Sequence, residues 1–139
     1  MARLKLDQDT LGLSSLMERI TRVRVKDCFK DDDDETIYFI VHRGEMGKAL
    51  GKGGVNVKKV QQILDKKIRV IEYNDDLAAF VRNVIYPVEV EEVKVDENTV
   101  IIKDSRKKTK SLLIGRESRN LNILKRAVRR FFNVEVKVE

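Results

Sequence analysis

The fold of this chain is decided by residues 41–56, which read VHRGEMGKALGKGGVN. The stretch predicts two helices, Gly44–Leu50 and Val55–Asp65, separated by the turn Gly51-Lys52-Gly53-Gly54. Gly51 can take the left-handed conformation that ends the first helix, and the two further glycines allow a ligand's backbone to come close. The second helix offers unpaired N–H groups and a positive dipole end, and Lys52 adds a cation. The pattern therefore predicts a clamp for a sugar–phosphate backbone.

The residues on either side complete a set of helices and strands. A helix is expected over Thr10–Ile20, where apolar residues recur every three to four positions. Two strands follow, Thr21–Lys30 and Thr36–His42, and the second is so apolar that we predict it to be central in its sheet. A strand over Lys67–Tyr73 closes the set. The predicted order is α-β-β-α-α-β.

The second half of the chain repeats this order. The predicted elements are helix Asp75–Ile85, strands Val88–Val95 and Thr99–Lys103, helices Arg106–Ile114 and Arg119–Phe132, and strand Val134–Val138. The two halves also match at an offset of 64 residues, which aligns Gly51 with Gly115 and Asn56 with Asn120. A repeat of this length indicates a duplicated module. We therefore predict two domains, residues 1–74 and 75–139.

The junction between the predicted domains contains no run of Gly, Ser or Pro. The helix over Asp75–Ile85, with Asn74 as its expected cap, follows directly on the preceding strand. Its apolar stripe consists of Leu77, Phe80, Val81 and Val84. We expect the two domains to pack rigidly, with this stripe between them.

Positive charge is concentrated in two segments of a chain whose net charge is +6. Residues 43–69 contain eight Lys or Arg against two acids, and residues 103–130 contain eleven against two. This distribution is typical of a phosphate-binding surface, although two solvated helices would give the same composition. The basic run Arg106–Lys110 can equally be a nucleic-acid contact or a solvated helix face.

The loop between two helices, followed by a strand and repeated, resembles the KH domain, whose GXXG loop holds about four nucleotides of a single strand. Residues 41–56 and 113–121 (LIGRESRNL) are similar to those of archaeal NusA-like transcription factors, which have two KH domains of the helix–strand-first (type II) order. The resemblance implies an α+β fold, an α/β sandwich with two three-stranded sheets covered by helices. It also implies binding of nascent single-stranded RNA and a role with RNA polymerase in transcription termination or pausing.

The residues expected to contact RNA lie in or beside the two loops: Arg43, Lys48, Gly51, Lys52, Gly53, Gly54, Asn56, Lys58, Lys59, Gly115, Arg116, Ser118 and Arg119. The second loop departs from the pattern. Glu117 should repel phosphate, and Ser118 replaces the last glycine, where its hydroxyl could cap the next helix. Arg116 and Arg119 could offset Glu117, so contact between this loop and RNA stays open.

Other sites have little support in the sequence. A P-loop requires glycine where Met46 stands, and a dinucleotide-binding motif requires glycine where Asn56 stands. The acidic run Asp31–Glu35 fits a solvated turn better than a metal site, and no nucleophile is visible for the single histidine, His42. We therefore expect no enzyme activity, no metal and no cofactor.

The single cysteine, Cys28, cannot form an internal disulfide, and we expect it to pack as a small apolar residue. A chain with one cysteine is typical of a reducing compartment. Neither a signal peptide nor an apolar run of about 20 residues is visible. We expect a cytoplasmic monomer without membrane contact. The alternative is a KH-containing ribosomal or ribosome-assembly protein, although such a protein would more often carry long basic tails.

Overall fold

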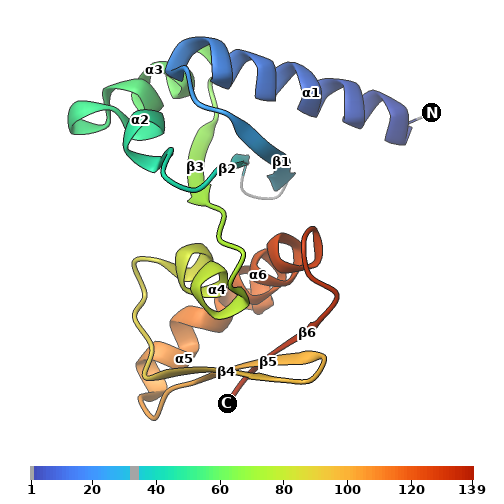
Figure 1. Ribbon diagram of the computed structural model, residues 1–139, viewed down its shortest axis with the longest axis vertical. Coiled ribbons are helices and arrows are strands. Elements are labelled where there is room, and N and C mark those ends of the chain that lie inside the picture. Colours follow the sequence, from blue (N-terminus) through green and yellow to red (C-terminus); the bar gives the residue numbers. More distant parts are fainter. Residues whose placement is uncertain (1, 32–34) are drawn as a thin grey trace. The chain divides into compact units, whose positions relative to one another are not determined.

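The computed structural model describes residues 2–31 and 35–139, with side chains from Gly12 onward. The chain divides into two units, Met1–Tyr73 and Asn74–Glu139 (Figure 1). The first contains α1 (Ala2–Thr21), β1 (Val25–Asp31), β2 (Thr36–Val41), α2 (Met46–Leu50), α3 (Val55–Leu64) and β3 (Lys67–Glu72). The second contains α4 (Leu77–Ile85), β4 (Glu92–Asp96), β5 (Thr99–Lys103), α5 (Lys107–Ile114), α6 (Arg119–Arg129) and β6 (Glu135–Val138). Each unit has the order α-β-β-α-α-β.

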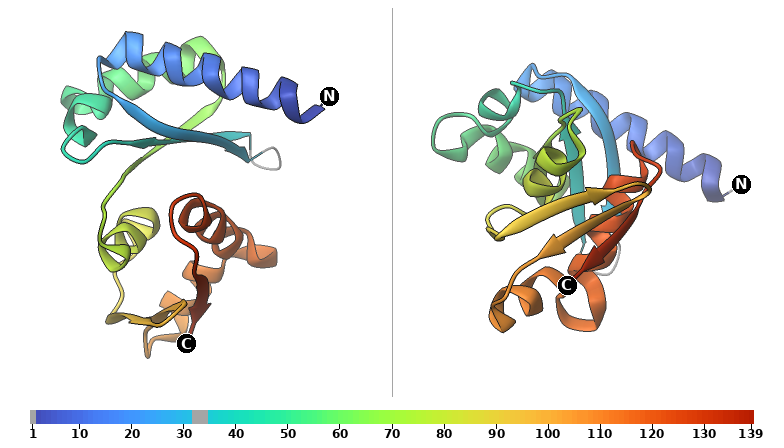
Figure 2. Two further views of the ribbon diagram at one scale, coloured as in Figure 1. Left: turned by 45° about the vertical axis from the view of Figure 1, so that its right-hand side comes forward. Right: turned by 60° about the horizontal axis from the view of Figure 1, so that its bottom comes forward.

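Each unit has one three-stranded sheet with the same pairing. The orders are β1-β2-β3 and β4-β5-β6, so β2 is central, as predicted. The first two strands of each sheet pair antiparallel, and the last strand pairs parallel with the central one. Helices α1 and α3 lie over one face of the first sheet, and α4 and α6 lie over one face of the second (Figure 2). This is a mixed α+β fold with helices covering three-stranded sheets.

The core of the first unit draws residues from all its helices and strands: Met17, Val23, Cys28, Ile37, Phe39, Val41, Ala49, Val60 and Val70. Cys28 is a free, buried thiol within this cluster, as expected for a small apolar residue. Ala49 in α2 and Val60 in α3 are both fully buried. Because these helices flank residues 51–54, the core anchors both ends of the first loop.

In the apolar stripe of α4, Phe80, Val81 and Val84 are buried and Leu77 is partly buried. The ring of Phe80 meets the ring of Phe131 edge-on, with centroids 5.6 Å apart, and lies 5.8 Å from the ring of Phe132. Both partners follow α6 in the same unit. Phe80 of the stripe therefore has its aromatic partners in its own unit, and packing of the stripe between the domains stays a prediction.

Several boundaries differ from the sequence predictions. Helix α1 runs from Ala2 to Thr21 and so displaces the start of β1 to Val25. Helix α4 is capped by Asp76, whose carboxylate accepts a hydrogen bond from the Ala79 N–H at 3.0 Å, and not by Asn74. Residues 32–34 of the predicted turn lie outside the described residues, and Asp31 does not belong to a solvated turn because it is the last residue of β1 and is buried.

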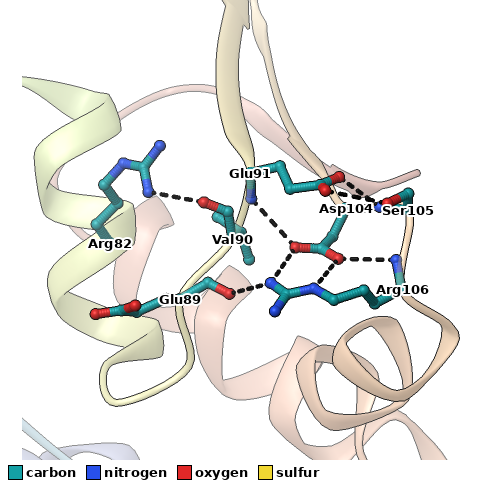
Figure 3. Close-up of polar contacts among 7 residues, drawn as sticks. All are labelled: Arg82, Glu89, Val90, Glu91, Asp104, Ser105 and Arg106. Carbon is teal, nitrogen blue, oxygen red and sulfur yellow. Dashed lines mark hydrogen bonds and ion pairs between the residues drawn. The ribbon is translucent and has the colours of Figure 1, made fainter.

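Strand β4 begins later than predicted because a polar network holds the residues before it (Figure 3). The carboxylate of Asp104, whose side chain is fully buried, accepts hydrogen bonds from Nε and Nη2 of Arg106 at 2.9 and 2.8 Å. It also accepts one from the Glu91 N–H at 3.1 Å, while Arg106 Nη2 donates to the carbonyl of Glu89 at 3.1 Å. Side chains thus satisfy backbone groups that could otherwise have joined the sheet.

The network predicts how stability responds to acid. Hydrogen bonds from Arg106 hold the pKa of the Asp104 carboxyl well below its usual range, although burial opposes this shift. The ionised carboxylate therefore stabilises the fold above about pH 4, and this contribution is lost as the pH falls further. Asp104→Asn should lower the thermal midpoint at pH 7, and its deficit relative to the unmodified protein should shrink below pH 4.

Thermal unfolding followed by circular dichroism at pH 7, 4 and 3 measures this effect. Asp96→Asn, at an exposed position at the end of β4, is the matched control and should change neither the midpoint nor its pH dependence. Equal midpoints for Asp104→Asn and the unmodified protein at pH 7 would contradict the prediction.

Candidate nucleic-acid interface

The first loop has a backbone that requires glycine. Gly51 has φ 74° and ψ 170°, a region accessible essentially to glycine alone. Gly53 and Gly54 follow in the left-handed region, with φ 66° and 76°. A Cβ added to either of these two would meet no other atom within 4 Å. The surface beside them is therefore open for the close approach of another backbone.

Helix α3 begins immediately after this loop without a side-chain cap. The Val55 N–H, the first of the helix, donates to the carbonyl of Lys52, and no capping side chain takes up the N–H groups that follow it. Lys52, Lys58 and Lys59 are all exposed, at the loop and on the first turns of α3. An uncapped helix start with cations beside it is suited to binding a phosphate.

Two more predicted cations precede the loop. Arg43 is exposed in the turn between β2 and α2, and Lys48 is exposed on α2. The Lys48 ammonium lies 3.9 Å from the Glu45 carboxylate, and the side chain of Lys48 is 64% exposed whereas that of Glu45 is 17% exposed. Because 3.9 Å is too long for a hydrogen bond, the exposed Lys48 ammonium can still turn toward an incoming anion.

The second loop has the same shape although its sequence differs. Gly115 has φ 73° and ψ 172°, and the next left-handed positions are Glu117 at φ 56° and Ser118 at φ 61°. A residue other than glycine in this conformation costs roughly 1–2 kcal/mol. Arg116, Glu117 and Arg119 line a surface hollow of about 260 Å³. The second loop thus keeps the conformation of the first loop although this strains the backbone at Glu117 and Ser118.

Ser118 does not cap α6, so the prediction of a hydroxyl cap is wrong. No hydrogen bond from the helix start reaches its side chain. A capping residue usually has an extended backbone, whereas Ser118 is left-handed. The start of α6 therefore lacks a side-chain cap, as does the start of α3.

Comparison with known proteins shows which family this chain is related to. The chain is 36% identical, over 86% of its length and 70% of the relative, to a Methanococcus vannielii protein named probable transcription termination protein NusA. It is 31% identical to a Halococcus morrhuae protein of the same name, over 96% of both chains. The family model described as KH domain matches residues 14–98. The chain belongs to the archaeal NusA-like family of KH-domain proteins.

A solved structure is similar to this NusA-like chain over almost its whole length. The crystal structure of APE1850 superposes with a TM-score of 0.77 at 31% sequence identity. The match covers 94% of this chain and 97% of the other. The fold of the NusA-like chain therefore has a close counterpart among solved structures.

The structure of the NusA-like chain adds Asn120, Leu50 and Val55 to the predicted site residues. Asn56, expected to contact RNA, donates its side-chain N–H to the carbonyl of Lys48 at 2.8 Å. Asn120 makes the same bond to the carbonyl of Leu112 at 2.8 Å, and the 64-residue offset could have identified it. Leu50 and Val55, which flank the first loop, are 36% and 56% exposed. Such apolar surface is suited to packing against a base.

Within residues 2–31 and 35–139 of the NusA-like chain, no helix is long and apolar enough to cross a membrane. The same ranges contain no group of three or more His, Cys, Asp or Glu side chains placed to hold a metal ion.

Proposed function

We propose that this NusA-like protein is a single-stranded RNA-binding transcription factor that acts in termination or pausing, by binding and not by catalysis. One observation carries the proposal: two loops of the same open shape, each at the uncapped start of a helix, lie in the two basic segments of the chain. Archaeal relatives over most of the chain are named probable transcription termination proteins, which supports the assignment to transcription.

The proposal assigns one type II KH domain to each half of the chain, residues 1–74 and 75–139. The shared order of elements supports this division, and so does the parallel pairing of the last strand in each sheet. Each domain would contribute one loop, so that one protein chain binds RNA as a monomer through two clamps.

In the first clamp, phosphate oxygens would accept hydrogen bonds from the N–H groups at the start of α3. Lys52 at the loop tip and Lys58 and Lys59 on α3 would neutralise the charge of the strand. The exposed side chains of Leu50 and Val55 would then contact the bases. Arg43 and Lys48 would extend the positive surface along the RNA.

In the second clamp, Gly115, Arg116, Ser118 and Arg119 would hold the strand with lower affinity. Glu117 adds a negative charge to the loop tip, and two arginines offset it. We propose that nascent RNA, held in this way beside RNA polymerase, is the ligand on which the factor acts.

The test is the salt dependence of binding to a fluorescently labelled single-stranded RNA of about 12 nucleotides. Each neutralised phosphate on a single strand contributes about −0.7 to the slope of log K against log salt concentration. With about four nucleotides per clamp, we expect a slope near −3 for one clamp and near −6 for two. Absence of binding, or equal affinity for duplex RNA, would contradict the proposal.

Transcription is tested separately in cells. Crosslinking and recovery of the protein should yield nascent transcripts together with RNA polymerase. Recovery of mature ribosomal RNA and ribosomal proteins instead would leave RNA binding intact and contradict a role in transcription.

A further inference from the structure

An asparagine joins the two helices behind each loop. Asn56 is the second residue of α3, and its Nδ2 donates to the carbonyl oxygen of Lys48 at 2.8 Å. Lys48 is third from the end of α2, so its carbonyl is among those that a helix leaves without an internal partner. Asn120 and Leu112 hold the equivalent places in α6 and α5, and their bond is also 2.8 Å long.

Each asparagine also lies against the first glycine of its loop. A Cβ built on Gly51 would stand 2.8 Å from Cγ of Asn56, and one on Gly115 would stand 2.7 Å from Cγ of Asn120. Real Cβ atoms do not approach so closely. The absence of a side chain at each of these glycines therefore makes room for the amide that crosses behind the loop.

The two loops need this bond for opposite physical reasons. The first owes its left-handed positions to Gly53 and Gly54, and glycine by itself leaves the backbone free to take many conformations. The second has Glu117 and Ser118 at those positions, and its strain would be relieved if the loop opened. A fixed link between the flanking helices restricts the first loop and keeps the second from opening.

We propose that Asn56 and Asn120 are positioning residues that hold the two loops in the clamp conformation before any nucleic acid arrives. Their effect on affinity rests on the proposed RNA-binding function, because a preformed loop loses less conformational freedom when it binds. Their effect on the free loops does not depend on that function.

The experiment uses Asn56→Leu and Asn120→Leu in the full chain, because leucine keeps the shape of asparagine but cannot donate a hydrogen bond. Asn122→Leu, two residues along α6 at an exposed position, is the matched control. Amide hydrogen exchange of residues 52–54 and 116–118 is measured by NMR without RNA. We expect faster exchange only in the loop whose asparagine is replaced, with thermal midpoints within a few degrees of the unmodified protein.

Affinity for a 12-nucleotide single-stranded RNA is measured on the same proteins. Loss of one hydrogen bond should weaken binding about two- to tenfold for Asn56→Leu. Unchanged loop exchange in both variants would overturn the inference, and so would faster exchange throughout a unit with a lowered midpoint. If the unmodified protein bound no RNA, the proposed function would fail, and the exchange measurements alone would decide the role of the asparagines.

Discussion

Replacing Lys52 and Gly53 together by Asp should abolish single-stranded RNA binding while the fold survives. The change removes a cation from the loop tip and places two carboxylates where phosphate is proposed to bind. Loss of the Lys52 contact, together with repulsion of phosphate by the two new carboxylates, should lower affinity at least about a hundredfold. Stability should change little, because Asp tolerates the left-handed conformation of Gly53 better than most residues and a Cβ there meets no atom.

Fluorescence anisotropy with the labelled RNA measures the affinity, and circular dichroism checks the fold. The matched control replaces exposed Gly12 and Lys94, which lie outside both loops, by Asp. It introduces the same change of charge and the same residue types, and it should retain most of the affinity. A folded Lys52→Asp, Gly53→Asp protein with unchanged affinity would refute the first loop as the main clamp.

Phe80→Ala should give the largest loss of stability of any single substitution considered. Phe80 is fully buried and contacts Phe131 and Phe132 through its ring. Truncation of a buried phenylalanine leaves a cavity and destabilises by roughly 3–5 kcal/mol. For a domain of this size, the midpoint of thermal unfolding should fall by more than about 10 °C.

Urea unfolding and calorimetry of the full chain measure this loss. Leu112→Ala is the control, because Leu112 is also a large apolar residue in the second unit but is 51% exposed. Its free energy of unfolding should change by less than about 1 kcal/mol. A similarly small change for Phe80→Ala would mean that the α4 stripe is not packed against the end of α6.

The features that sequence predicted correctly depend on local signals. The glycines at 51, 53 and 54 mark the first loop because glycine takes the backbone angles of all three positions without strain. The central place of β2 follows from six consecutive residues that are suited to burial on both faces. The 64-residue offset transferred both features to the second half of the chain.

The features that sequence missed depend on contacts between distant residues or on unusual backbone angles. Strand β4 was expected from Val88, but Asp104 and Arg106 bind the backbone of residues 89 and 91 instead. Ser118 has the chemistry of a cap, and only its left-handed backbone prevents it from acting as one. The apolar stripe of α4 can be recognised from the spacing of its residues. Its partners after α6 lie about 50 residues further along the chain, and periodicity does not predict a contact over such a separation.

The parallel pairing of the last strand in each unit has a consequence for synthesis of the protein. Residues 36–41 of β2 leave the ribosome well before their partners in Lys67–Glu72. Until then one edge of β2 is unpaired and can form hydrogen bonds with a non-native strand. Val70 is also missing from the core that anchors α2 and α3. The growing chain thus exposes the basic loop at Gly51 before the core that anchors it is complete. If the loop is the proposed clamp, the chain can bind a strand there only after Glu72 has emerged.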